Sequence, residues 1–213
     1  MTPALKFTVL GDGGTDRVLR LSIKWLLEQR VRSRPIEAAW ADLGRLRQPP
    51  TNLAERVVEA IRSYPCDLLF IHRDAENQPA QQRYDKIHAA VSDLELPPMI
   101  CVVQVRMTEA GQLFNEAALR RAAGNPNGGV VLSMPCVAEL ELVLDPKEIL
   151  YNLLRQASEL PQGRLKKFRV HVRAARLVDY LDDFSPLRSL TAFNRLEADI
   201  DEVVHVKGWD LSP

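Results

Sequence analysis

The sequence predicts an α/β fold in which a mostly parallel sheet is flanked by helices and followed by a helical C-terminal part. Apolar runs alternate with helix-like segments through about residue 110, as expected for strands joined by helical crossovers. The later runs are continuously apolar, which is typical of a sheet covered on both faces. A glycine-rich turn at residues 11–14 follows the first run. In open α/β sheets, chemistry gathers beyond such carboxyl ends of strands.

The first 110 residues are predicted to contain four strands and the helices between them. The first helix has an apolar face at helical spacing from Val18 to Leu27 and stops before Pro35. Thr51 or Asn52 is expected to cap the second helix, which Pro65 ends. The expected strands are residues 5–10, 36–40, 67–72 and 99–106. Besides the first helix, which follows the glycine-rich turn, two helices are expected at roughly residues 52–64 and 81–94.

The rest of the chain is predicted to be helical, at about residues 115–123, 146–158, 168–181 and 190–204. Asp145-Pro146 and Ser185-Pro186 are N-terminal signals, because each places Pro at the first helical position. We therefore expect an α/β core at residues 1–110 and a helical C-terminal extension at residues 111–213 that packs on the core.

Composition excludes several classes of protein. Lys and Arg number 28, as do Asp and Glu, so the chain has no global basic field, and a nucleic-acid contact needs a local patch or a basic partner. The cysteines Cys66, Cys101 and Cys136 are odd in number and form no CxxC pair, which favours reduced thiols in a cytoplasmic protein. We expect no secretory signal and no membrane segment.

Five acidic residues are expected at strand ends or in first helical turns. Because the carboxyl ends of parallel strands meet at one edge of a sheet, these side chains could gather in one cleft. Hard divalent cations prefer oxygen ligands, and clustered carboxylates repel one another unless a positive charge neutralises them. The set predicts a Mg²⁺ or Mn²⁺ site formed by Asp12, Asp16, Asp74, Glu76 and Glu109.

Each acid also has a purely structural interpretation. Asp16 could cap its helix, Asp74 could turn the chain after its strand, and Glu109 could complement a helix dipole. The turn at residues 11–14 could cradle a phosphate directly, but it completes neither a Walker motif nor a dinucleotide fingerprint. Asp12 within the turn would repel a phosphate, which favours binding through a metal.

Several cations are candidates for contact with phosphate. Arg73 could clamp a phosphate or pair with a carboxylate, and Lys147 could stabilise developing negative charge or lie on the surface. His72 could be a base, a ligand or a hydrogen-bonded residue at a strand end. The strongest basic run could bind a nucleic-acid backbone or form a solvated helix end, and its members are Arg164, Lys166, Lys167 and Arg169.

These features together resemble the TOPRIM fold, a Rossmann-like fold of topoisomerases, primases and the overcoming-lysogenization-defect nucleases. The resemblance lies in the strand, the acid in a glycine-rich turn, and the Asp-x-acid pair after a later strand. More narrowly, the chain resembles a TOPRIM-like bacterial family of unknown function, often encoded beside ATPases in settings of defence against phage. The stretches that carry this narrower resemblance are residues 105–110, 120–128, 145–148 and 182–188.

The resemblance implies metal-dependent phosphodiester chemistry. Asp12 matches the position where the first TOPRIM motif has Glu, and Asp74-Ala75-Glu76 matches its Asp-x-Asp motif. Asp16 is similar to a second acid in the first motif of the nuclease branch, and Glu109 and Lys147 are weaker matches. Asp12 and Glu76 each keep an acid but change its reach by one methylene group.

We therefore expect a Mg²⁺- or Mn²⁺-dependent nuclease that acts on DNA in preference to RNA, with a role in antiviral defence. Asp12, Arg73 and Lys147 are the expected catalytic residues. The alternative is a catalytically weak effector or sensor subunit that binds an ATPase partner. A third interpretation is a nucleotide-binding domain that uses the glycine-rich turn. The oligomeric state stays open.

Overall fold

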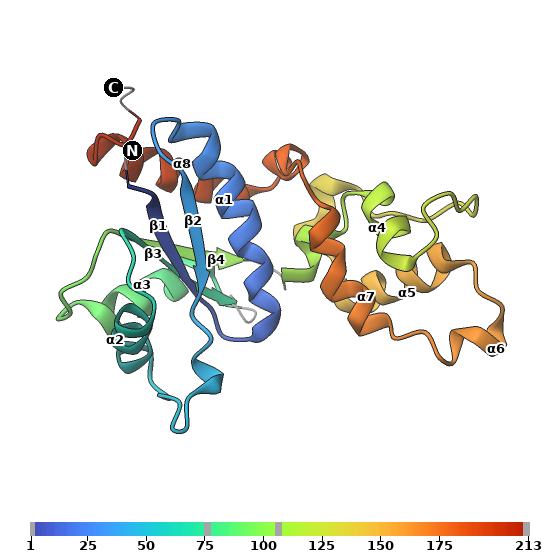
Figure 1. The fold of residues 1–213 in the computed structure, drawn as a ribbon, viewed down its shortest axis with the longest axis horizontal. Helices are drawn as coiled ribbons and strands as arrows, with labels where there is room; N and C mark the ends of the chain where they lie inside the picture. The colour runs from blue at the N-terminus through green and yellow to red at the C-terminus, as the bar shows by residue number, and fades with distance from the viewer. Residues whose placement is uncertain (1–2, 75–77, 105–107, 211–213) are drawn as a thin grey trace. The chain divides into compact units, whose positions relative to one another are not determined.

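The computed structural model describes residues 3–74, 78–104 and 108–210. The chain divides into two compact units (Figure 1). Unit 1 comprises residues 1–105 and 192–213, and unit 2 comprises residues 106–191. The expected boundary lay at residue 110 with everything beyond it in one extension, whereas the last helix clusters with the sheet. Among the described residues, no helix is both long enough and apolar enough to cross a lipid bilayer.

Unit 1 is built on a four-stranded, all-parallel sheet in the order β2-β1-β3-β4. The strands are β1 (Leu5–Leu10), β2 (Ile36–Trp40), β3 (Leu68–Asp74) and β4 (Met99–Gln104). The register places Val9 of β1 opposite Trp40 on one side and Phe70 on the other. This confirms the predicted α/β class and its parallel sheet, and the strand limits agree with the expected ones within two residues.

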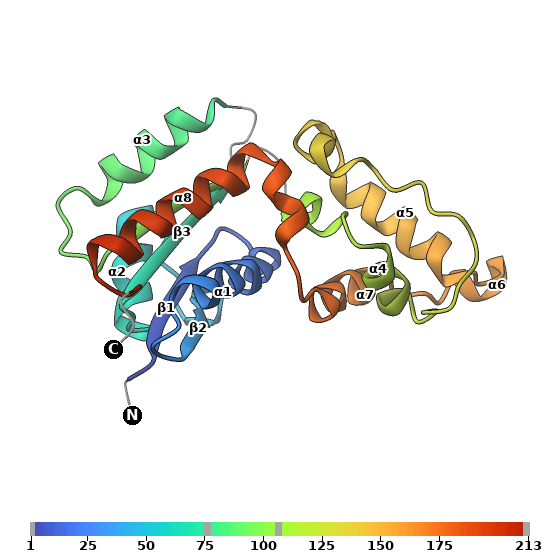
Figure 2. The same cartoon turned by 90° about the horizontal axis from the view of Figure 1, so that it is seen from above.

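Three helices join the strands: α1 (Leu19–Arg30), α2 (Leu53–Ser63) and α3 (Ala80–Val91). On one face, Leu69, Ile71 and Val103 of the sheet form a buried cluster with Val57 of α2 and Ile87 of α3. Figure 2 shows α1 on the other side of the strands from α2. Because both faces are covered, β3 is apolar over its first four residues, 68–71, rather than alternating.

The connection from β1 to α1 is longer than the sequence predicts. A 3₁₀ helix, η1 (Gly14–Val18), precedes α1, which begins at Leu19 rather than directly after the turn. Gly11 is required at the end of β1, because a Cβ atom there would lie 2.7 Å from Trp40 Cη2 and 2.9 Å from Asp16 Cβ. The chain therefore passes tightly over Trp40 before it turns.

The last helix, α8 (Thr191–Val206), completes unit 1. It buries Phe193, Leu196, Ile200 and Val204, which recur at helical spacing. Arg30 at the end of α1 forms ion pairs with Glu197 and Asp201 of α8. These contacts fasten the C-terminal helix to the first helix of the unit.

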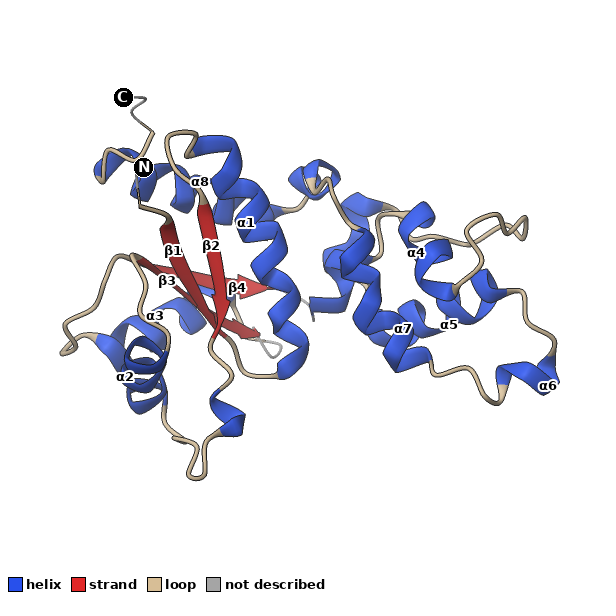
Figure 3. Cartoon of the chain, viewed as in Figure 1, coloured by secondary structure: helices blue, strands red, loops and turns tan. Residues whose placement is uncertain are grey.

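Unit 2 is drawn as helices and loops in Figure 3, and the sheet lies entirely within unit 1. The predicted helix start at Asp145 is confirmed, because its side chain accepts a hydrogen bond from the first turn of α5 (Pro146–Ser158), and Asn115 caps α4 (Glu116–Ala123) in the same way. The helix predicted at residues 168–181 is shorter than expected. The α-helix α7 covers Val170–Leu177, and the chain then continues as the 3₁₀ helix η5 (Val178–Tyr180). The elements are η3 (Thr108–Gln112), α4 (Glu116–Ala123), η4 (Val137–Leu142), α5 (Pro146–Ser158), α6 (Gln162–Leu165), α7 (Val170–Leu177), η5 (Val178–Tyr180) and η6 (Ser185–Ser189).

Candidate metal centre at the strand ends

The strand order creates a topological switch point between β1 and β3. From β1 the chain continues to β2 on one side, and from β3 it continues to β4 on the other. In open α/β sheets, ligands bind in the crevice outside the carboxyl ends of strands at such a point. The turn after β1 carries Asp12 and Asp16, and β3 ends with His72, Arg73 and Asp74. The topology therefore brings the turn after β1 and the end of β3 to the same edge of the sheet.

Asp12 connects the end of β1 to two arginines. Its Oδ2 lies 2.7 Å from Nε of Arg73, and its Oδ1 accepts a hydrogen bond of 2.9 Å from Nη1 of Arg56. Arg56, in the first turn of α2, also donates to the carbonyl of Gly11. Both carboxylate oxygens of Asp12 are therefore engaged by guanidinium groups, which neutralise its charge.

Asp16 is buried and holds the glycine-rich turn in shape. Its Oδ2 accepts a hydrogen bond of 2.9 Å from the backbone N–H of Gly13. Asp16 is therefore not the N-cap of the following helix, as one interpretation expected: it lies within η1 and bonds back to Gly13, the residue that precedes η1. Its other oxygen, Oδ1, lies 3.9 Å from Nε2 of His72. Asp16 therefore both stabilises the turn and faces the end of β3.

His72 lies between the two acidic clusters. Its side chain is fully buried, and Nδ1 is 2.9 Å from the carbonyl oxygen of Val102 on β4. Nε2 points to the acids, at 3.4 Å from Oδ1 of Asp74. Among the described residues, neither Nε2 of His72 nor Oδ1 of Asp74 has a hydrogen-bond partner, although both atoms are buried. Buried polar atoms of this kind are rare in folded proteins.

The structure does not place the other predicted site residues in this group. Glu76 and the side chain of Glu109 lie outside what the structure describes. Lys147 belongs to unit 2, where its Nζ lies 6.0 Å from the centroid of the Tyr151 ring in the first turns of α5. Over the described ranges, no group of three or more His, Cys, Asp or Glu is arranged ready to hold a metal ion.

The basic run lies in unit 2, at α6 and the segment that leads to α7. Its four predicted cations are exposed, and in the part of the chain that the structure describes they form no ion pair: Arg164, Lys166, Lys167 and Arg169. Phe168 is covered by the guanidinium of Arg173, 5.8 Å from the ring centroid. The run is therefore an exposed basic surface with an ordered aromatic residue within it.

Sequence reasoning missed Arg56 and left the role of His72 open among a base, a ligand and a hydrogen-bonded residue at a strand end. Arg56 lies 44 residues from Asp12 in the chain. One signal could have found it: in a parallel sheet, a crossover helix begins at the carboxyl edge of the strands, so its first turn faces the same crevice. For His72 the signal was its position two residues before Asp74 on a buried strand, which places both side chains on one face.

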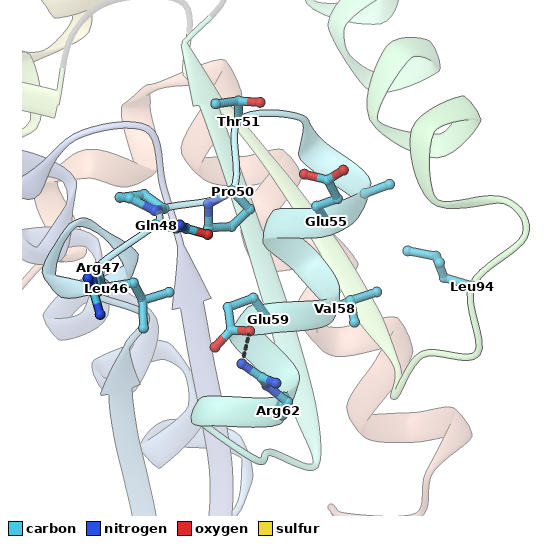
Figure 4. Close-up of a pocket in the computed structure, with 12 residues that line it drawn as sticks. Leu46, Arg47, Gln48, Pro50, Thr51, Glu55, Val58, Glu59, Arg62 and Leu94 are labelled. Atoms are coloured by element: carbon cyan, nitrogen blue, oxygen red, sulfur yellow. Dashed lines mark ion pairs between the residues drawn. The ribbon is translucent and has the colours of Figure 1, made fainter.

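A separate open groove of about 780 Å³ lies beside α2 (Figure 4). It is lined by residues 46–51, by one side of α2 that includes Val58, and by Leu94. Its charged residues are of both signs, and Glu59 pairs with Arg62. None of the acids at the switch point lines it. The groove thus offers no concentrated charge for an anion or a cation.

Comparison with known proteins adds no assignment, because neither a protein-family model, nor a curated protein, nor a solved structure matches the chain.

Proposed function

We propose that the chain is a Mg²⁺- or Mn²⁺-dependent nuclease that hydrolyses phosphodiester bonds in DNA, or in RNA. One observation carries the proposal: Asp12 and Asp16 after β1 reach the same strand ends as Asp74 of β3, joined through Arg73 and His72. Acids from separate parts of the chain thus gather at the switch point, where α/β proteins bind their ligands.

Two buried atoms at the strand ends support a divalent cation. Nε2 of His72 and Oδ1 of Asp74 are both buried and face each other, and within the described part of the chain neither has a hydrogen-bond partner. A cation bound between them would interact favourably with both atoms. Asp16, Asp74 and Glu76 are the residues that would hold the ion. A divalent ion supplies Lewis acidity and an activated water at neutral pH.

The remaining residues would act on the phosphate and on protons. Arg73 lies beside the acids, with a guanidinium that suits two phosphate oxygens. Asp12 would leave its arginine partners and then take one of two roles. It would bind the metal ion, or it would accept a proton from water. Lys147 remains a proposed contact for negative charge, in unit 2. The exposed basic surface at residues 164–169 would bind the nucleic-acid backbone.

The first experiment compares plasmid nicking by the wild type and by Asp74→Asn, with Mn²⁺ or Mg²⁺. We expect the wild type to nick supercoiled plasmid and the variant to lose about 100-fold or more of the rate, since a ligand is removed without a change in size. Asp93→Asn, which removes an equal charge beyond the end of α3, should cleave normally. Equal rates in all three proteins would refute the assignment, provided that their thermal unfolding is alike.

The contacts of Asp12 with two arginines favour a second function. Both oxygens of Asp12 are held by arginines, as expected of a site that is inactive alone. The chain would then be an effector or sensor subunit that docks on an ATPase. Nicking that appears only after a candidate ATPase is added to the assay supports this function over the first.

A further inference from the structure

We infer that Arg56 and Arg73 form a phosphate-binding clamp, which the carboxylate of Asp12 occupies until a phosphate group displaces it. The inference rests on the proposed function only for the origin of the phosphate, a nucleic acid. Its basis is that two guanidinium groups from separate elements converge on one carboxylate. Nε of Arg73 lies 2.7 Å from Oδ2 of Asp12, and Nη1 of Arg56 donates a hydrogen bond of 2.9 Å to Oδ1.

Regular structure holds the two cations in place. Arg56 lies in the first turn of α2 and also donates from Nη2 to the carbonyl oxygen of Gly11. Arg73 is the last residue but one of β3, where its backbone pairs with Val103 of β4. A cation in the first turn of a helix opposes the helix dipole, so Arg56 is unfavourable there unless an anion lies beside it. Both guanidinium groups are therefore in position before a ligand arrives.

Asp12 is the exchangeable member of the group. It lies between Gly11 and Gly13 in an exposed turn, and its side chain is 33% exposed, against 18% for Arg56 and 25% for Arg73. Among the described residues, the buried Nε of Arg73 has no hydrogen-bond partner, so its contact with Asp12 is an ion pair in poor hydrogen-bond alignment. Guanidinium groups bind phosphate in the same forked manner as carboxylate, so a phosphate can replace Asp12.

The clamp lies on a different face of the sheet from the acid at the end of β3. Side chains alternate along a strand, so Arg73 projects to the same face as Ile71, which packs in the buried cluster with α2. His72 and Asp74 project to the opposite face, where Nε2 and Oδ1 lie 3.4 Å apart. Asp74 is therefore directed away from the clamp, and Asp12 is the acid that competes with phosphate for the two arginines.

The first test measures the binding of inorganic phosphate to the full chain by calorimetry, with a chelator present so that no metal ion contributes. We expect the wild type to bind and Asp12→Asn to bind about tenfold more tightly, because the side chain keeps its size but loses the charge that occupies the clamp. Asp42→Asn, which removes an acid from an exposed pair with Arg45, is the matched control and should bind as the wild type does.

The alternative is that Asp12 only ties the turn to α2 and β3. It predicts that Asp12→Asn unfolds more easily without any gain in phosphate affinity. An unchanged or lower affinity in a folded Asp12→Asn overturns the inference, as does the absence of phosphate binding in both proteins.

Variants of Arg56 test the clamp from the other side. Arg56→Gln should weaken phosphate binding about tenfold or more, since a charge-assisted hydrogen bond is lost. Arg56→Lys keeps the charge, which preserves the fold, but it lacks the planar fork and should also bind more weakly than the wild type. Arg62→Gln, on the same helix and paired with Glu59 at the surface, is the matched control. Equal affinities in the variants of Arg56 and in Arg62→Gln overturn the inference.

Oligonucleotides identify the source of the phosphate. Tighter binding of a 5′-phosphorylated oligonucleotide than of its unphosphorylated form would assign the clamp to a terminal phosphate, and equal binding would assign it to an internal phosphodiester. In either case Arg56→Gln has to weaken the binding.

These readouts separate the inference from the proposed function. Phosphate binding that depends on Arg56, in a chain that nicks no plasmid with Mn²⁺, would sustain the inference and contradict the nuclease. Nicking by a chain in which Arg56→Gln binds phosphate as tightly as the wild type would sustain the nuclease and overturn the inference.

Discussion

At the scale of single residues, Cys101 shows how burial changes the chemistry of a group that lies away from the site. The thiol lies on β4, in the buried cluster formed with α2 and α3. Burial raises its pKa to about 11, with Asp199 adding to the increase and Arg195 opposing it. The thiol therefore stays neutral and unreactive at physiological pH, as expected for a structural cysteine.

This pKa predicts a loss of stability in alkali. Between about pH 9 and pH 11 the thiol ionises in the unfolded chain but not in the folded one, so the free energy of unfolding falls as pH rises. From pH 8.5 to pH 10.5 we expect the wild type to lose roughly 1–2 kcal/mol more than Cys101→Ala. Urea unfolding at both pH values measures the difference. Cys66 and Tyr84 are common to both proteins, and equal losses would contradict the prediction.

Single residues also mark the limit of what the sequence predicts about the site. Asp12, Asp16 and Asp74 could be brought together because each follows a recognisable strand, and parallel strands end at a common edge. Arg56 could not, since its approach to Asp12 depends on the angle at which α2 crosses the sheet. The tautomer of His72 depends on the carbonyl of Val102, 30 residues away, and that pairing exists only in the folded sheet.

At the scale of elements, local sequence signals such as N-cap residues predicted the positions of most helices and strands. Asn52 and Asp145 cap α2 and α5 as predicted, because their side chains accept from backbone N–H groups of the first turn. The 3₁₀ helix η1 was missed, since it depends on Asp16 bonding back to Gly13 rather than on a helix-forming pattern. The place of α8 in unit 1 was missed because it depends on contacts between residues far apart in the chain, among them the ion pairs of Arg30 with Glu197 and Asp201.

The attachment of α8 is testable through Arg30. Its side chain is largely buried and joins Glu197 at 2.7 Å and also Asp201, so its loss leaves two acids without this cation. We expect Arg30→Met to lower the free energy of unfolding by about 1–3 kcal/mol. Lys24→Met, which breaks an exposed pair with Glu28 on the same helix, should change it by less than about 0.5 kcal/mol. Equal effects in urea unfolding would show that Arg30 does not fasten α8.

At the scale of the whole molecule, the charges sum to zero but are unevenly distributed along the chain. The chain has 28 basic and 28 acidic residues, yet the stretch from Arg155 to Arg176 carries seven Lys or Arg and one acid, Glu159. A neutral protein exerts no long-range attraction on DNA, so binding has to come from such a local surface. The two units would then have different tasks, with backbone binding in unit 2 and the acidic centre in unit 1.

This division predicts a specific dependence of DNA binding on salt. Each lysine that contacts a phosphate releases condensed counterions, and its removal lowers the slope of log K against log salt by about 0.9. Lys166→Gln with Lys167→Gln should therefore lower the slope by roughly 2 and weaken binding about tenfold or more, measured by fluorescence anisotropy on duplex DNA. Lys24→Gln with Lys207→Gln removes the same charge from unit 1 and should leave the slope unchanged. Equal slopes for both pairs would place the DNA contact elsewhere, because a surface that binds phosphates cannot lose two cations without releasing fewer ions.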